Sequence, residues 1–140
     1  MCQIVCTLLS CNSVMANVTD DVSVPVVDID DNGTFKYVLI KISNAGTANK
    51  KNATYLVRGH GWADYHMDLV EECERQVRDK KSDLRIQCVG GGRIRHDRDR
   101  KNITVYGYSV GYGQADHALT CKILKTYNQD YTIDWHNEGY

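Results

Sequence analysis

The sequence contains a single proline, no long apolar run, and charges that nearly cancel to a formal net charge of -1 over 140 residues. The missing long run excludes a membrane-spanning helix, which needs about 20 consecutive apolar residues. The missing basic excess argues against a general nucleic-acid-binding protein. Apolar and charged contents of 42% and 25% are typical of a soluble globular chain. We therefore expect one domain, because this length supports one core but not two.

The sequence also lacks the paired cysteine and histidine spacings of disulfide frameworks and zinc sites. Six cysteines are present, but three of them fall in predicted helices and strands, where small buried thiols are common. Four of the five histidines, His60, His96, His117 and His136, show no metal-ligand spacing with a cysteine or a carboxylate either. We expect a reducing compartment, a cytoplasmic location, no metal and no cofactor. The six cysteines are Cys2, Cys6, Cys11, Cys73, Cys88 and Cys121.

The first residues lack the positive charge that opens a signal peptide, since the first basic residue is Lys36. The apolar run Ile4–Leu9 is also short for a secretory signal. We therefore interpret residues 1–23 as a disordered extension, or as a segment upstream of a functional start at Met15. The folded domain is expected to span residues 24–140.

Apolar residues alternate, or run continuously over short stretches, in seven segments that read as strands. Spacings of three and four residues predict two helices, at 62–78 and 114–127. Strands and helices are interleaved along the chain, which is typical of an α/β (α+β) domain. We expect a mixed sheet of about six strands packed with two helices. The strand segments are 26–29, 35–42, 54–58, 84–88, 93–96, 102–108 and 131–135.

Two glycine-rich stretches stand out, Gly90–Gly92 and Gly107–Gly113. We interpret both as turns, the first leading to Arg93 and the second presenting Ser109 ahead of a helix. Glycine allows several backbone N–H groups to point at one spot, and an arginine beside them suits a phosphate or another tetrahedral anion. Ordinary hairpin and strand-to-helix turns would explain the same pattern.

Other residues strengthen the anion interpretation. His66 lies on the apolar side of the first predicted helix, where a lone histidine is usually a hydrogen-bonded core residue. Three cations, however, occur at predicted strand ends: Lys36, Arg58 and Arg93. Each has an alternative explanation, such as the apolar stem of a surface lysine lying on the protein. Together they predict a phosphate site with a base or nucleophile in reach.

A competing pattern is Gly107–Gly111, which matches the G-x-S-x-G turn of serine hydrolases with Ser109 as the nucleophile. The chain is short for that fold. His117 is close to Ser109 in sequence and His136 lies near the terminus, so neither is placed as a separate triad member. We keep a small serine hydrolase as the weaker alternative.

Several segments resemble the phosphohistidine phosphatases of the janus/ocnus family. The resemblance covers about Val26 to Tyr140 and includes specific motifs in order. They are Val27–Asp30, Gly33–Ile40, Val57–Gly59, Trp62–His66, Gly90–Ile94, Val105–Ser109 and Asn137–Tyr140.

The resemblance implies an enzyme that removes phosphate from phosphohistidine in proteins without a metal, through a catalytic histidine at His66. It places phosphate binding at Lys36, Arg58, Arg93 and the turn Ser109, Val110 and Gly111. Glycine at 111 and Met67 after the catalytic position depart from the family pattern, but neither removes a charged group. The domain 24–140 is then the phosphatase domain, expected to be monomeric, with phosphohistidine proteins as partners and neither nucleic acid nor membrane.

The residues leave the chemistry of His66 open. It could deprotonate an attacking water, the role we favour, or accept the phosphoryl group itself. Lys36, Arg93 and the backbone at 109–111 would hold the phosphoryl oxygens in either case. The alternative function is a non-catalytic janus-type module that binds phosphoproteins or anions.

Overall fold

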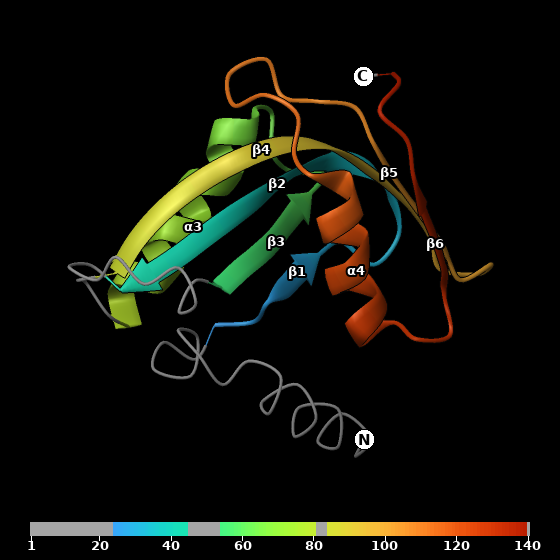
Figure 1. Cartoon of the computed structure of the whole chain (residues 1–140), viewed down its shortest axis with the longest axis horizontal. Coiled ribbons are helices and arrows are strands. Elements are labelled where there is room, and N and C mark those ends of the chain that lie inside the picture. Colours follow the sequence, from blue (N-terminus) through green and yellow to red (C-terminus); the bar gives the residue numbers. More distant parts are fainter. Residues whose placement is uncertain (1–23, 45–53, 81–83, 140) are drawn as a thin grey trace.

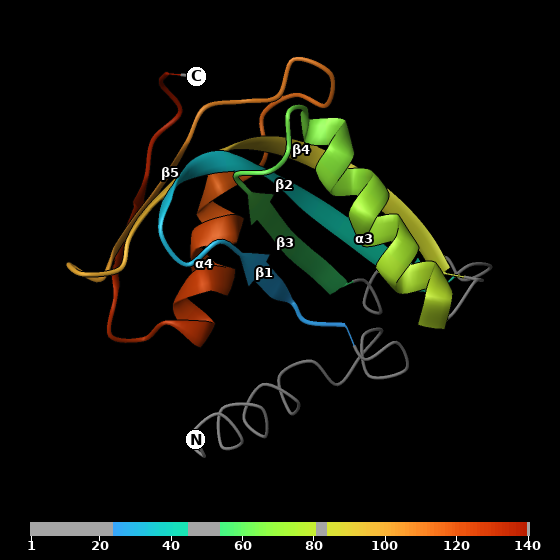
Figure 2. The same ribbon diagram turned by 180° about the vertical axis from the view of Figure 1, so that it is seen from behind.

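The computed structural model describes residues 24–44, 54–80 and 84–139 (Figure 1). These residues form one six-stranded sheet in the order β1-β3-β2-β4-β5-β6. Helix α3 (His66–Lys80) covers one face and α4 (His117–Tyr127) the other, as Figures 1 and 2 show from opposite sides. The predicted α+β domain with a mixed sheet and two helices is confirmed. The strands are β1 (Val27–Ile29), β2 (Gly33–Asn44), β3 (Thr54–His60), β4 (Leu84–Asp97), β5 (Asn102–Tyr106) and β6 (Thr132–Trp135).

The long strands β2 and β4 form the centre of the sheet. β2 is antiparallel to both β3 and β4, and β4 is antiparallel to β5. The outer strands β1 and β6 run parallel to β3 and β5. Side chains along β2 alternate between the α3 face and the α4 face, and both faces are covered. Burial on both faces explains the continuous apolar run from which this strand was predicted.

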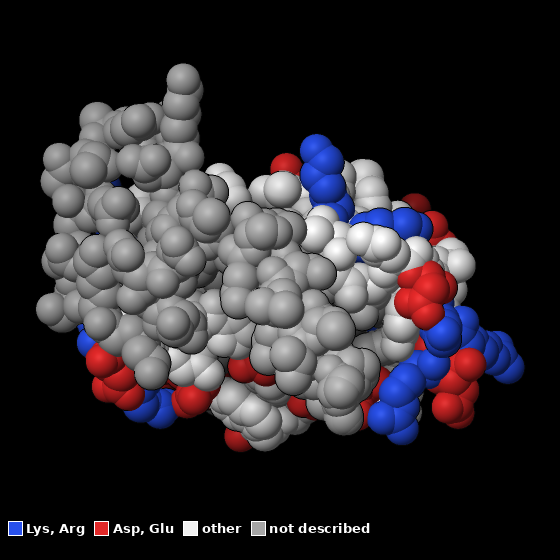
Figure 3. All heavy atoms as spheres, turned by 90° about the horizontal axis from the view of Figure 1, so that it is seen from below, with Lys and Arg blue, Asp and Glu red and all other residues white. Residues whose placement is uncertain are grey.

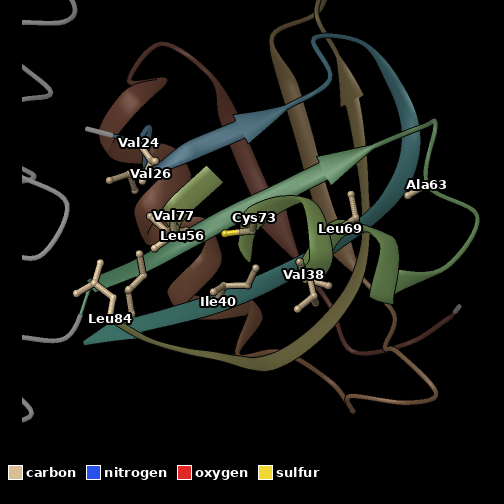
Figure 4. Close-up of a cluster of buried hydrophobic side chains, with 12 residues drawn as sticks. Val24, Val26, Val38, Ile40, Leu56, Ala63, Leu69, Cys73, Val77 and Leu84 are labelled. Atoms are coloured by element: carbon tan, nitrogen blue, oxygen red, sulfur yellow. The ribbon is translucent and has the colours of Figure 1, made fainter. Parts of the chain in front are cut away.

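Two apolar clusters, one on each face, hold the helices to the sheet. The α3 face meets three helix residues one turn apart, which Figure 4 shows facing the strands. The α4 face is built in the same way around Cys121 and Leu124. The α3 cluster includes Val38, Ile40, Leu56, Leu69, Cys73 and Val77, and the α4 cluster includes Tyr37, Leu39, Val57, Ile94 and Ile103.

The interpretation of Gly90–Gly92 as a turn is wrong. The segments 84–88 and 93–96, predicted as separate strands, are one continuous β4, and the three glycines lie inside it. A register shift between Leu39 and Ile40 of β2 leaves Val89 as the extra residue of a bulge. Glycine is required at these positions because atoms of neighbouring segments leave no space for a side chain. A Cβ on Gly90 would lie 2.6 Å from the backbone of Ala115, and one on Gly92 would lie 2.4 Å from the Tyr106 carbonyl oxygen.

Both helices begin later than the periodicity predicted. α3 starts at His66 rather than at residue 62, because Asp68 turns back to accept hydrogen bonds from the N–H groups of Asp64 and Tyr65 at 3.1 and 3.0 Å. α4 starts at His117 rather than at 114, because Asp116 caps it by accepting from the N–H of Leu119. Among the described residues, no helix is long and apolar enough to cross a lipid bilayer.

The charged turn between β4 and β5 lies on the surface. Arg98 pairs with Asp31 at 2.8 Å, and Lys101 pairs with Asp130 at 2.6 Å. Figure 3 shows Lys and Arg side chains intermingled with Asp and Glu side chains at this end of the molecule. Exposed pairs of this kind contribute little stability, and their charges cancel locally. This turn is therefore no candidate for an anion site.

The predictions for residues 1–23 lie outside the described residues. The boundary between an extension and a domain at residue 24 stays a prediction.

Gly92→Ala should lower the free energy of unfolding by about 1–3 kcal/mol, because the new methyl group meets the fixed Tyr106 carbonyl and the His117 ring. Gly111→Ala is the matched control, since nothing lies within 4 Å of a Cβ at that position. Urea unfolding followed by circular dichroism measures both. An unchanged urea midpoint for Gly92→Ala would show that the crowding around β4 is wrong.

Candidate active site

Lys36 and Arg93 lie side by side on the face of the sheet that α3 covers. They are direct partners in the antiparallel pairing of β2 with β4. Lys36 points to the same face as Val38 and Ile40, one strand position beyond the apolar part of that face. Both side chains are half-buried. Like charges directly opposite each other on a sheet are unfavourable, so a bound anion would stabilise this pair.

His66 is the first residue of α3, and its ring packs over β4 with only 8% of the residue exposed. Its Nε2 lies 2.9 Å from the carbonyl oxygen of Gly92. A carbonyl can only accept, so Nε2 carries a proton and donates it to this bond. In the neutral ring the lone pair is therefore on Nδ1. No hydrogen-bond partner for Nδ1 occurs among residues 24–44, 54–80 and 84–139, which leaves this atom available to a substrate.

The surroundings of His66 keep its ring neutral. Burial is the largest effect and lowers the pKa of the imidazole below its usual value. The hydrogen bond to Gly92 raises the pKa in part, and the positive charges of Lys36 and Arg93 lower it further. These effects place both cations within electrostatic reach of the ring. Near pH 7 the result is an uncharged imidazole beside two positive charges.

Gly91 lies between His66 and Ser109. A Cβ at residue 91 would be 2.8 Å from Cδ2 of His66 and 3.2 Å from Cβ of Ser109. It would also be 2.7 Å from the backbone carbonyl oxygen of Tyr37. The missing side chain therefore allows the histidine ring and the serine to approach the same stretch of β4. The structure thus brings His66 and the Ser109 turn together from separate parts of the sequence.

The turn after Ser109 is closed by its own backbone and attached to β4. The N–H of Ser109 donates to the Gly113 carbonyl at 3.0 Å, and the N–H of Gly113 returns a bond at 2.8 Å. The same Gly113 carbonyl accepts from the N–H of Gly91 at 3.0 Å. Val110 and Gly111 at the tip are exposed, and no residue of the described ranges accepts their N–H groups. Two backbone donors are therefore available to an anion beside His66.

Arg58 does not join this group. Its side chain is buried, and its guanidinium donates to the carbonyl oxygens of Pro25, Val26 and Val57 at 2.8, 3.3 and 3.1 Å. Because β1 and β3 are parallel, Pro25 and Val26 lie toward the beginning of β3. Lys36 pairs with His60 at the opposite end of that strand. The structure thus places the Arg58 guanidinium on the backbone leading into β1, where it ties that backbone to β3.

The serine-hydrolase geometry is absent from the described residues. Ser109 lies in a closed turn that ends several residues before α4, so it is not at a sharp turn leading directly from a strand into a helix. Both ring nitrogens of His117 are occupied, because Nε2–H donates to the Gly107 carbonyl at 2.8 Å and Nδ1 accepts from the Tyr37 hydroxyl at 2.7 Å. The Ser109 hydroxyl accepts from the N–H of Tyr112 at 3.2 Å. His117 is thus not available to activate Ser109.

The described cysteines are not activated thiols. Cys73, Cys88 and Cys121 are free, and burial raises the pKa of Cys88 to about 11 and that of Cys121 to about 12. They stay protonated near neutral pH and are poor nucleophiles. The described His, Cys, Asp and Glu residues also form no group of three that could hold a metal ion.

Sequence reasoning missed the parts that β4 contributes to the site. The Gly92 carbonyl fixes the tautomer of His66, and Gly91 provides the space between His66 and Ser109. Beneath them, the Thr120 hydroxyl lies 3.0 Å from the Tyr37 hydroxyl, which in turn donates to His117. The signal for the first two was present, since three adjacent glycines interrupt an otherwise regular strand pattern. Only the packing shows what each glycine accommodates.

Comparison with known proteins matches the Janus/Ocnus family (Ocnus) over residues 21–132. A 14 kDa phosphohistidine phosphatase from Sus scrofa is 41% identical over 129 residues, covering 90% of this chain and 100% of that protein. Its namesake from Homo sapiens is 41% identical over 125 residues, covering 88% and 98%. The sex-regulated protein janus-A from Drosophila simulans is 46% identical over 117 residues, covering 84% and 82%. The predicted resemblance is thereby confirmed, and this chain belongs to the Janus/Ocnus family.

Proposed function

We propose that this protein is a protein-histidine phosphatase that hydrolyses phosphohistidine in other proteins. Two relatives that match nearly their whole length carry the name phosphohistidine phosphatase. The observation that carries the proposal is the convergence of a neutral histidine, two cations and two unpaired backbone N–H groups around Gly91. Such a group fits a phosphoryl substrate, whose charged oxygens need donors and whose phosphorus needs a nucleophile.

In the favoured mechanism His66 acts as a general base. Lys36, Arg93 and the N–H groups of Val110 and Gly111 hold the phosphoryl oxygens, and a water molecule lies between phosphorus and Nδ1. As the water oxygen bonds to phosphorus, its proton passes to Nδ1. The N–P bond breaks, and its electron pair goes to the substrate imidazole, which takes up a proton as it leaves. The products are phosphate and histidine, and the protein supplies mainly positioning and charge.

The alternative mechanism uses the same atom as a nucleophile. Nδ1 would attack phosphorus directly, and water would release phosphate from His66 in a second step. The Gly92 carbonyl supports either role, because it holds the proton on Nε2 and turns Nδ1 toward the substrate. Arg58 would serve only indirectly, by ordering the strands beside Lys36.

The proposal also includes a monomer that acts in the cytoplasm without a metal, with phosphohistidine proteins as partners rather than nucleic acid or membrane. Lys36, Arg93 and the backbone donors provide the positive charge that a metal ion supplies in many phosphoryl-transfer enzymes. The free thiols in the described residues agree with a reducing compartment.

His66→Gln should reduce kcat/KM for a phosphohistidine protein by at least about a hundredfold, because glutamine keeps a donor but provides no base or nucleophile. His96→Gln is the matched control: His96 is equally buried at 8% and binds the Asp30 carbonyl and the Tyr131 hydroxyl instead. Phosphate release and circular dichroism are measured for both proteins. Full turnover by a folded His66→Gln protein would rule out the assigned role, and binding without release by the wild type would favour the non-catalytic module.

Lys36→Met should move the acidic limb of the pH–rate profile to higher pH. The active ring is neutral, and Lys36 helps to keep the pKa of His66 low, so its removal lets His66 gain a proton at a higher pH. At alkaline pH the loss in kcat/KM should still be about ten- to a hundredfold, from the missing phosphate contact.

Lys41→Met is the control for this comparison, because Lys41 lies on the same strand but pairs with Tyr55 and Gln87. Its profile should overlay that of the wild type. If Lys36→Met leaves both the acidic limb and the alkaline rate unchanged, Lys36 lies outside the site.

A further inference from the structure

Three exposed apolar side chains border the candidate active site. Met67 directly follows His66 and is 52% exposed, Val110 directly follows Ser109 and is 80% exposed, and Tyr112 is 36% exposed. They come from two segments more than forty residues apart, which meet where His66 and Ser109 approach Gly91. Single exposed apolar residues are common, but an apolar group beside a catalytic centre is typical of a binding surface.

Tyr112 lies within electrostatic reach of the outer face of α3 that begins with Met67. Burial is the largest cause of the raised pKa of the Tyr112 hydroxyl, and the charges of Cys88, Glu74 and Glu71 add to it. Residues 67, 71 and 74 are spaced by four and three, so they share one face of the helix. Figure 2 shows the segment between β5 and α4 at the same end of the molecule as the start of α3. Met67, Val110 and Tyr112 therefore belong to one surface, which we call the apolar border.

The charge around the apolar border changes sign with distance from His66. Lys36 and Arg93 make the centre positive. Burial is the largest cause of the lowered pKa of His66, and these two positive charges lower it further. Glu71 and Glu74 follow Met67 along α3, one and two turns farther from His66, and make that outer edge negative. A bound chain would thus meet cations at its phosphoryl group, apolar side chains next to it, and carboxylates farther out. This order is complementary to a phosphohistidine followed by an apolar and then a basic residue.

We propose that the apolar border binds the polypeptide of the substrate beside its phosphohistidine, and selects an apolar neighbour with a basic residue beyond it. This inference rests on the proposed phosphatase function and adds the sequence preference. The occupant is a protein segment rather than free phosphohistidine, because the apolar side chains of the border adjoin the phosphoryl contacts but make none of these contacts themselves. Removing one apolar side chain from water on binding corresponds to about a tenfold gain in kcat/KM or more.

The test compares three kinds of substrate with the full-length protein: free phosphohistidine, a phosphohistidine pentapeptide with glycine at the other positions, and the same peptide with leucine beside the phosphohistidine and lysine next to the leucine. The leucine–lysine arrangement is made in both chain directions. The wild type should hydrolyse the better leucine–lysine peptide at least about tenfold more efficiently than the glycine peptide.

The variant is Met67→Gln with Tyr112→Gln, which removes two apolar side chains without touching Lys36, Arg93, His66 or the N–H groups of the turn. It should lose most of the tenfold preference and keep wild-type kcat/KM for free phosphohistidine. Trp135→Gln is the control, since Trp135 is 45% exposed but lies in β6, whose Ile133 belongs to the α4 cluster. Replacing Glu71 and Glu74 by glutamine should remove only the part of the preference that depends on lysine.

The outcomes separate the two proposals. If the wild type hydrolyses all three substrates equally well, or the double variant keeps the full leucine preference, the apolar border has no such role while the phosphatase function stands. If a folded double variant loses kcat/KM equally for free phosphohistidine and for the peptides, the proposed role of the apolar border is also wrong. If the wild type hydrolyses none of the substrates, the phosphatase function itself fails. Single Met67→Gln and Tyr112→Gln proteins, each with about half of the effect, replace the double variant if it unfolds.

Discussion

The ring of His66 can rest against β4 because residue 91 has no side chain. A methyl group there would collide with the ring, with Ser109 and with the backbone of Tyr37 at the same time. On the other face, Gly90 and Gly92 allow the backbone of Ala115 and the carbonyl of Tyr106 to approach as closely. Over Gly90–Gly92, atoms of other segments therefore lie against the backbone of β4 on both faces of the sheet. The histidine, the turn and the start of α4 depend on this one stretch of bare backbone.

The electrostatics of the site follow from the same packing. His66 is buried enough to be held neutral, and the two cations beside it favour the neutral form further. The unfavourable proximity of Lys36 and Arg93 is maintained because both residues are fixed by adjacent strands in register. A phosphoryl group bound between them would offset their mutual repulsion.

Much of the fold and of the candidate site was predictable, because local pattern carries it. The continuous apolar run at 35–42 predicted a buried strand, and helical spacing predicted that His66 lies on the apolar side of the first helix. The resemblance to the janus/ocnus family, which the comparisons confirm, then suggested roles for Lys36, Arg93 and Ser109 that the structure leaves to experiment. Helix starts were misplaced because Asp68 and Asp116 decide them through single hydrogen bonds, which periodicity does not register.

Features that depend on distant contacts were not predictable. Three glycines in a row have the composition of a turn, and only the approach of Ala115, His66 and Tyr106 from other elements explains why they lie in a strand. Arg58 shares its strand with site neighbours, but its guanidinium turns to the carbonyls that lead into β1. The bond from His66 to the Gly92 carbonyl, which determines the protonated nitrogen of the ring, is seen only in the packing.

The most direct test of this account is the ring ¹⁵N spectrum of His66 in the labelled protein, followed as a function of pH. The account predicts that the neutral ring carries its proton on Nε2, that Nδ1 is unprotonated, and that the ring titrates below the usual histidine pKa of about 6.5. A proton on Nδ1 in the neutral ring, or a pKa above the usual value, would contradict the assignment of Nδ1 as the atom that performs the reaction.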